Sequence, residues 1–286
     1  MSKETLEHLN THTLIGYTDK RGTAWHYRAD EQGEEPNHYP GAIPIEHIKR
    51  RLFDWQLVEG EITATHIGDE GVLQFTDPTR KAIMRSDTGV ILGIFKQGYR
   101  PHQYDEWLVH NVQDILDADL QVGSAGVLKG GAQAWVQIEM PETLEAAEGV
   151  KYRPFLTSAT SADGSIATTY GTGAQLVVCD NTLSVALGSF GEKIKIRHSR
   201  NSLNKIGDVR DALNIVHQVS DIFEAQVAEL TSQYVSDQQW KDFVKAFTQP
   251  ESKSTRSIGM AEKKASELNR LWNYDAMVAP WKNNAF

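Results

Sequence analysis

A short stretch of alternating cations and isoleucines carries the clearest chemical signal in the sequence. In KIKIRHSR (193–200) the alternation has a period of two, which is typical of a β-strand with one charged face. The following residues extend the charge into a turn. The predicted phosphate-binding residues are Lys193, Lys195, Arg197, His198 and Arg200. Cations in a line on a sheet surface suit the backbone of a nucleic acid.

The charge of the whole chain leaves a second interpretation of this stretch open. The 286 residues carry a net charge of −9, so the protein is not a globally basic nucleic-acid binder. Residues 192–210 hold six basic and two acidic residues, which gives +4 there and leaves −13 for the remainder. The stretch is therefore either a local binding site or a solvated face that balances an acidic protein.

The single cysteine raises the question of an enzyme. Cys179 ends an apolar, strand-like run from Leu176, and Asn181 is suited to cap a short helix that Gly188 would end. A helix N-terminus lowers the pKa of a thiol, which would favour a nucleophile. Free cysteine is also among the most buried residue types, and a buried, inert thiol explains the same residues.

A catalytic Cys179 would need partners from elsewhere in the chain. The enzyme hypothesis places Asp163 and His198 beside it, as an acid or base. The alternative is that Asp163 forms, with Gly164, the turn of a hairpin, since Asp-Gly is favoured in two-residue turns.

The sequence gives little support for a metal site, a cofactor or a membrane-spanning helix. The histidines show no HExxH spacing, no P-loop occurs, and one cysteine cannot build a disulfide or a cysteine-based zinc site. No apolar stretch approaches the roughly 20 residues of a membrane helix. We therefore predict no cofactor, no metal and no membrane contact, and a cytoplasmic location.

Turn residues between strand-like segments predict four hairpins. The segments are ITATHIGDEGVLQFTD, KAIMRSDTGVILGIF, VGSAGVLKGGAQAWVQIE and YRPFLTSATSADGSIATTY. Four hairpins indicate a largely antiparallel sheet. With the helices that interrupt and follow it, the predicted fold is α+β: a hairpin-rich antiparallel sheet, flanking helices and a long C-terminal amphipathic helix.

The spacing of apolar residues and capping residues predicts where the helices lie. One begins near Ile45 and a second at Pro101, a residue suited to a first helical position. The longest periodic run extends from Ile206 to Tyr234, and it either packs on the sheet or offers a seam to a partner. Ser236 opens a further helix with a capping box, and a last helix covers about 260–272. The expected organisation is an arm (1–40), a hairpin core domain (41–200) and a helical region (201–286).

Several motifs together resemble a known family. Between Trp25 and His198 the chain contains, in order, AWH, RSDTGVILG, YRPHQYDEWL, GSAGVLKGGAQAWV, RPFLTSATSADGS, LVVCDNTLSVAL and RHS. This set is similar to the phage/plasmid-like protein family, which carries domain of unknown function 932. Two positions depart from the family pattern: Ala162 stands where a histidine is common, and Gln175 and Leu176 stand where an arginine is usual. Both departures count against a catalytic role there.

The resemblance implies a bacteriophage or other mobile-element protein that works in the host cytoplasm. At the level of fold it also resembles the single-strand annealing proteins of phage recombination, which is an analogy. The first hypothesis is a non-enzymatic protein that binds single-stranded DNA, with Trp25 or Tyr99 stacking bases. Its specific form is an oligomeric mediator of strand annealing or recombination. The alternatives are the Cys179 enzyme and a protein that binds a host factor through the long helix.

Overall fold

The computed structural model confirms an α+β fold. It describes residues 12–18, 35–69, 71–113, 120–139, 144–145, 149, 151–153, 155–173, 176–189, 193–199, 202, 225–276, 278–279 and 282–285. Contacts divide the chain into two units. The first comprises Met1–Thr143 and Tyr152–Val219, and the second comprises Leu144–Lys151 and Ser220–Phe286.

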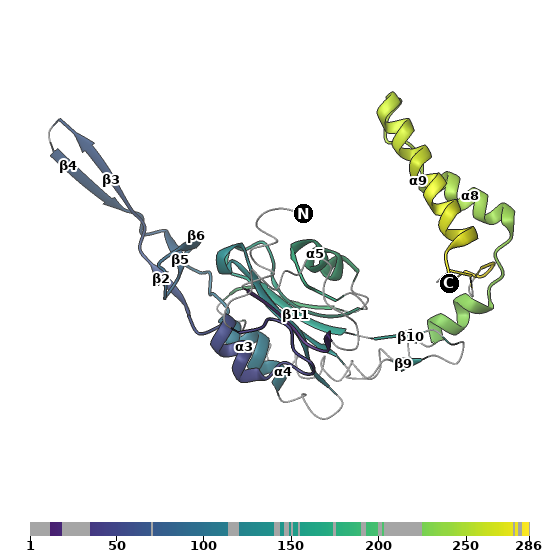
Figure 1. The fold of residues 1–286 in the computed structure, drawn as a ribbon. Helices are drawn as coiled ribbons and strands as arrows, with labels where there is room; N and C mark the ends of the chain where they lie inside the picture. Colours follow the sequence, from purple (N-terminus) through teal and green to yellow (C-terminus); the bar gives the residue numbers. More distant parts are fainter. Residues whose placement is uncertain are drawn as a thin grey trace. The chain divides into compact units, whose positions relative to one another are not determined.

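A six-stranded antiparallel sheet forms the centre of the first unit (Figure 1). In spatial order its strands are β1 (Thr13–Ile15), β7 (Gln121–Leu128), β8 (Gln133–Glu139), β11 (Phe155–Ser161), β12 (Thr168–Gly173) and β13 (Lys193–Ile196). The pairs β7–β8 and β11–β12 are two of the predicted hairpins. Strand β1 pairs with β7 and lies within the stretch expected to form an arm.

The other two predicted hairpins form smaller sheets. Strands β3 (Thr63–Gly68) and β4 (Gly71–Thr76) pair only with each other among the described strands. The hairpin of β5 (Arg80–Arg85) and β6 (Ile91–Lys96) is joined by β2 (Leu57–Gly60) in a three-stranded sheet. A fourth sheet, which was not predicted, is the short pair of β9 (Leu144–Glu145) and β10 (Lys151–Tyr152). All four hairpins are therefore confirmed.

One turn differs from its prediction. The connection between β11 and β12 spans residues 162–167, so it is longer than a two-residue turn. Only Gly164 has a positive φ, 78°, whereas the predicted turn needs positive φ at Asp163 as well. The Asp163 carboxylate instead accepts a hydrogen bond from the backbone N–H of Ser165 at 2.8 Å, which stabilises a wider loop.

Helices cover both faces of the six-stranded sheet (Figure 1). On one face, α3 (Ile45–Leu52) packs with a π-helix, η2 (Asp105–His110), which continues into α4 (Asn111–Gln113). On the other face lies α5 (Asp180–Ser189), whose Leu183 contacts Trp135 and Ala159 in a buried cluster. The alternation of side chains along β8 and β11 supplies apolar residues to both faces.

The second helix begins later than predicted. Helical backbone starts at Tyr104, and Pro101 lies in a segment without regular structure before it. The side chain of Gln103 ties this segment to β2, because it both donates to and accepts from the backbone of Leu57, each at 2.9 Å. Leu57 also pairs with Arg85 of β5, so these two bonds satisfy its backbone N–H and carbonyl on the outer edge of β2.

The apolar run that ends at Cys179 is not a strand. Residues 176–178 have no regular structure and cross the face of the sheet. Side chains of the sheet satisfy the backbone of Val177: Gln137 accepts from its N–H at 2.7 Å, and Ser124 donates to its carbonyl at 2.5 Å. Because these polar side chains take the place of a strand partner, the backbone is buried without a ladder.

Most of the described residues of the second unit are helical. Residues 225–232 form a helix, and α8 (Asp237–Phe247) begins with the predicted capping box of Ser236 and Gln239. The last helix, α9 (Thr255–Tyr274), starts five residues before its predicted beginning, with Ser254 as its N-cap. The predicted helix from 206 lies outside the described residues up to 224. None of the described helices is long and apolar enough to cross a membrane.

Candidate nucleic-acid interface

Strand β13 is the last strand of the six-stranded sheet and carries the predicted alternation. Lys193 and Lys195 are exposed, Ile194 is half-buried, and Ile196 is buried with 1% of its surface exposed. The isoleucines are held inward because burying them stabilises the sheet edge. The strand therefore presents its two lysines to solvent, as the sequence pattern indicated.

The strand register shows which side of the sheet the lysines occupy. Lys195 pairs with Thr169, and Thr169 pairs with Ala159 on the next strand. Directly paired residues on antiparallel strands share a face. Ala159 packs against Leu183 of α5. Lys193 and Lys195 therefore lie on the face that α5 covers, two strands from that contact.

Arg197 follows β13 directly and is exposed. Arg200 lies outside the described residues, so its predicted contribution stays a prediction. We call Lys193, Lys195 and Arg197 the basic row. Three positive charges in a line at the edge of the sheet can attract an extended polyanion that lies on the protein surface.

His198 does not continue the basic row. Its ring is half-buried, with Nδ1 2.8 Å from the hydroxyl of Tyr99 and Nε2 3.2 Å from the hydroxyl of Thr160. Burial lowers the pKa of His198 to about 4, so the ring is neutral near pH 7. A neutral, internally bonded imidazole adds no charge for a phosphate, so His198 is left out of the basic row, and its predicted contact with phosphate stays a prediction.

The ring of His198 belongs to a column of five stacked rings. The order is Phe95, Tyr99, His198, His102 and Trp107, with centroid separations of 3.8, 5.1, 4.0 and 3.8 Å. We call this set the ring column. Tyr99 has a ring neighbour on each side, so it offers no face on which a base could stack. Trp25, the other predicted base-stacking residue, lies outside the described residues.

Burial dominates the electrostatics of the ring column. Burial, together with a smaller effect of the neighbouring His198, lowers the pKa of His102 to about 3. His102 Nδ1 lies 2.6 Å from the hydroxyl of Thr168, whereas its Nε2 has no hydrogen-bond partner among the described residues. Burial also raises the pKa of Tyr99. The column is thus an uncharged structural element.

The ring column was not predicted from the sequence. Its members come from residues 95–107 and 198, and no regular spacing connects the two segments. His102 does lie in the motif YRPHQYDEWL, but a single polar residue in such a motif does not reveal its partner.

Cys179 is a buried thiol beside a helix start. It is 7% exposed, and its Sγ lies 3.4 Å from the hydroxyl of Thr182. That hydroxyl also accepts from the backbone N–H groups of Val178 and Cys179, at 2.9 and 3.0 Å. Thr182 therefore satisfies the backbone at this helix start, and the prediction of Asn181 as the cap is wrong. The helix also continues through Gly188.

The three residues of the enzyme hypothesis have separate partners. Cys179 contacts Thr182, Asp163 accepts from the Ser165 backbone, and His198 bonds to Tyr99 and Thr160. No hydrogen bond joins any two of the three. In the described part of the chain, no group of three His, Cys, Asp or Glu residues is placed to hold a metal ion.

Comparison with known proteins gives one match. A family model described as "Domain of unknown function (DUF932)" matches residues 91–286. The match includes the ring column, α5, the basic row and the described helices from residue 225 onwards. No curated protein and no solved structure matches.

Proposed function

The chain belongs to the DUF932 family, and from that premise we propose that it binds single-stranded nucleic acid along the basic row. The observation that carries the proposal is the exposure of Lys193, Lys195 and Arg197 along one edge of the sheet. Alternate residues of a strand are about 6.7 Å apart, so the row forms a short line of charges. A flexible single strand can follow such a line, whereas the rigid duplex presents its phosphates on a helical path.

The similarity of the motifs to phage and plasmid proteins supports a role in the DNA metabolism of a mobile element. In this proposal the protein is non-enzymatic and acts in the host cytoplasm, as a mediator of recombination or strand annealing. The separate partners of Cys179, Asp163 and His198 favour this over the enzyme alternative. The host-factor alternative depends on the helix from 206, most of which is outside the described residues.

The experiment compares nucleic-acid binding of two variants of equal charge. In the first, Lys193, Lys195 and Arg197 are replaced with glutamine. In the control, three exposed lysines of the second unit are replaced with glutamine; they are Lys241, Lys245 and Lys253. Affinity for a single-stranded oligonucleotide is measured over a series of salt concentrations.

The two variants are compared by the salt dependence of their affinity, because each cation that contacts a phosphate releases counterions on binding. The slope of log affinity against log salt is about 0.7 per phosphate neutralised on a single strand, so removing three cations should reduce it by about two. The control should keep the wild-type slope. If the wild type binds no nucleic acid at low salt, the proposal fails. If both variants behave alike, the basic row is only a solvated face.

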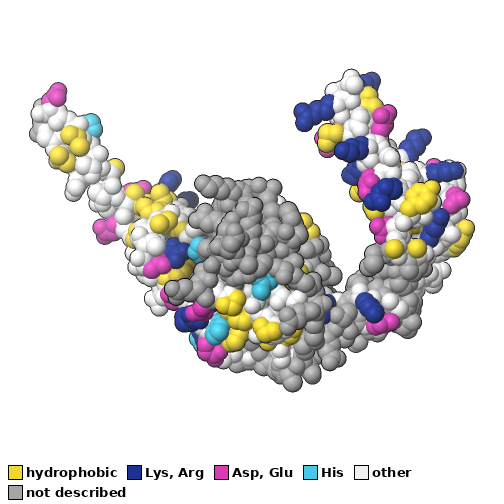
Figure 2. Space-filling model, viewed as in Figure 1, with side chains coloured by type: hydrophobic (Ala, Val, Ile, Leu, Met, Phe, Trp, Pro, Cys, Tyr) yellow, Lys and Arg dark blue, Asp and Glu magenta, His cyan; other side chains and the backbone are white. Residues whose placement is uncertain are grey.

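A second proposal concerns self-association through the β3–β4 hairpin. Every residue of both strands is exposed, and hydrophobic side chains gather there in Figure 2. The paired residues Ala64 and Phe75 share a face with His66 and Leu73, and Phe75 and Leu73 are 60% and 56% exposed. An isolated two-stranded hairpin is marginally stable in water. We propose that a second copy of the chain covers this face.

Light scattering on the full chain tests self-association. Leu73→Thr with Phe75→Thr should lower the molar mass to that of the monomer, since both substitutions remove exposed apolar surface and keep β propensity. Gln74→Thr, on the opposite face, is the control and should keep the wild-type mass. A wild type that is monomeric at every concentration would refute self-association.

A further inference from the structure

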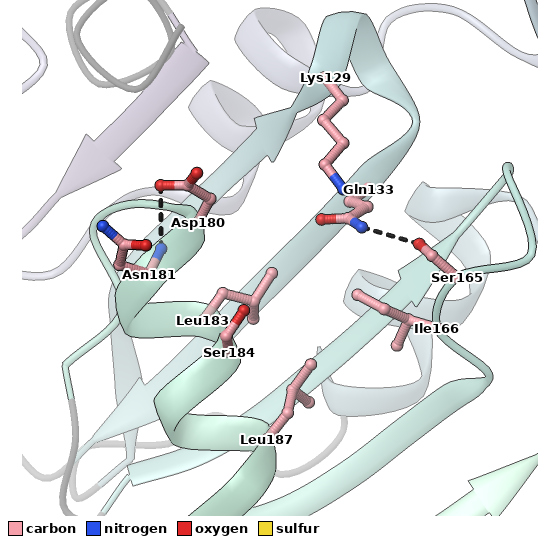
Figure 3. A pocket seen from close by; sticks show the side chains of 9 residues that line it. All are labelled: Lys129, Gln133, Ser165, Ile166, Asp180, Asn181, Leu183, Ser184 and Leu187. Carbon is pink, nitrogen blue, oxygen red and sulfur yellow. Dashed lines mark hydrogen bonds between the residues drawn. The ribbon is translucent and has the colours of Figure 1, made fainter. Parts of the chain in front are cut away.

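A cavity lies between α5 and the end of the sheet, on the face that carries the basic row. Its volume is about 410 Å³, within the usual range for small-molecule sites. Helix α5 contributes Leu183, Ser184 and Leu187, and the β11–β12 loop contributes Ser165 and Ile166 from the other side (Figure 3). Both walls belong to the first unit, so the cavity is an integral part of the sheet domain.

The apolar side chains of the cavity stand on opposite walls. Ile166 faces Leu183 and Leu187 across the opening in Figure 3. All three belong to or pack against the buried cluster under α5, which holds them in place. Two facing apolar walls suit a flat ring, because each face of the ring then replaces water with hydrocarbon.

A polar edge lies at the end of this space. Gln133 is 7% exposed and donates from its Nε2 to the hydroxyl of Ser165 at 2.7 Å. Its amide oxygen accepts no hydrogen bond from the described residues and is directed towards α5 in Figure 3. Because this oxygen is not among the buried unpartnered atoms, it is open to the cavity and can accept a hydrogen bond from a ligand that supplies an N–H group.

The charge of the lining argues against a phosphate as the ligand. One lysine, Lys129, and one carboxylate, Asp180, line the cavity and balance each other. A neutral, flat, hydrogen-bonding group fits such a lining better than an anion does. A nucleobase has this chemistry, with two apolar faces and an edge of donors and acceptors.

The cavity adjoins the basic row. Ile196 of β13 pairs with Thr168 of β12, so Arg197 lies beside the residue that precedes Thr168. Ile166 is only two residues before Thr168 in the chain. A strand whose phosphates follow the basic row therefore reaches the wall of the cavity at the Arg197 end.

We propose that the cavity between α5 and the β11–β12 loop receives one nucleobase of a strand bound along the basic row. This inference rests on the proposed function. The base inserts between Ile166 and the leucines of α5, and its amino or imino N–H donates to the amide oxygen of Gln133. Its neighbours in the strand stay outside, where their phosphates face Lys195 and Arg197.

The test uses the full chain and a single-stranded oligonucleotide in which 2-aminopurine lies between adenines. Stacking on adenine quenches the fluorescence of 2-aminopurine, so insertion of that base into the cavity should raise it. Ser184→Trp places a large side chain in the cavity from an exposed position. Val185→Trp is the matched control, since Val185 is the next residue of α5, is 55% exposed and does not line the cavity.

We expect Ser184→Trp to abolish the rise in fluorescence and to weaken binding by roughly tenfold, the usual scale for losing one stacked base. Val185→Trp should keep both. If Ser184→Trp does not fold, Ser184→Met provides a smaller obstruction for the same comparison. A wild type that binds no strand at low salt overturns the proposed function. Strand binding that needs the basic row, without a rise in fluorescence or with equal effects of the two tryptophans, overturns the cavity proposal alone.

Discussion

The imidazole rings of His198 and His102 are stacked, with their centroids 4.0 Å apart and their planes inclined by 15°. The contact joins the residue that follows the basic row to the segment that precedes η2. His198 is further held by the hydroxyls of Tyr99 and Thr160. The edge of the sheet is thereby joined to the helical side of the core, and the two imidazoles would repel each other if both were charged.

The first prediction is a loss of stability in mild acid. An unfolded histidine binds its proton near pH 6.5, whereas His198 and His102 in the folded protein bind theirs near pH 4 and 3. Between these values the unfolded state binds more protons, so the free energy of unfolding falls as the pH falls. Each histidine contributes about 1.4 kcal/mol per pH unit in this window.

Urea unfolding at pH 7, 6 and 5 measures this dependence. His198→Phe keeps a stacked ring but cannot titrate, so its unfolding free energy should fall less steeply with pH than that of the wild type. It should be less stable at pH 7, because the hydrogen bonds of the ring to Tyr99, Thr160 and Thr168 are lost. His110→Phe, at an exposed position at the end of η2, is the control and should keep the wild-type slope. Equal slopes for all three proteins would contradict the assignment of neutral, buried imidazoles.

The second prediction concerns the reactivity of Cys179. The thiol is 7% exposed and packs against Thr182, so a thiol reagent should reach it only when the protein opens. Native protein should therefore react slowly, and protein in urea should react rapidly with one equivalent. Fast labelling of the folded protein would show an accessible thiol and would reopen the enzyme alternative.

The local patterns of the sequence predicted much of the fold. The four hairpins are confirmed because turn residues and strand alternation are short-range signals, and the capping box of Ser236 and Gln239 is confirmed for the same reason. The exposed lysines of β13 also follow from alternation alone. The prediction that these lysines bind nucleic acid concerns a ligand, and it stays a prediction.

What could not be predicted depends on contacts between distant residues. The run 176–179 has the composition of a strand, yet Gln137 and Ser124 bind its backbone from the sheet and keep it irregular. The sequence pattern groups His198 with its charged neighbours. In the structure its ring is half-buried, because it bonds to Tyr99 and stacks on His102. In both cases the partners are tens of residues away in the sequence, so no local pattern indicates the contact.

The third prediction tests whether Thr182 or Asn181 caps the start of α5. Thr182→Val removes the hydroxyl that accepts from Val178 and Cys179, and it should lower the free energy of unfolding by about 1–2 kcal/mol, as the loss of a helix cap does. Asn181→Ala changes the cap favoured by sequence alone and should alter stability by no more than about 0.5 kcal/mol. Chemical denaturation of both variants measures the difference. The reverse order of effects would contradict the hydrogen bonding of this helix start.

The fourth prediction follows from the pairing of Gly126 with Trp135 across β7 and β8. The indole of Trp135 is fully buried, lies over the glycine and donates to the hydroxyl of Ser124 at 3.2 Å. A methyl group at Gly126 would lie 2.2 Å from Cη2 of that ring, well inside van der Waals contact. The indole cannot move away easily, because α5 packs over it on this face of the sheet.

Gly126→Ala should therefore lower the free energy of unfolding by about 1–3 kcal/mol, the usual cost of overpacking a core, and by more if the hydrogen bond to Ser124 is also lost. Gly41→Ala is the matched control, because no atom lies within 4 Å of the added methyl group and its φ is not in the left-handed region. That variant should be as stable as the wild type or about 0.4–1 kcal/mol more stable, since alanine restricts the unfolded chain. Thermal or urea unfolding measures the difference in stability between the two variants. If Gly126→Ala is as stable as Gly41→Ala, the indole does not cover the glycine, and the packing of α5 against this face would need to be redrawn.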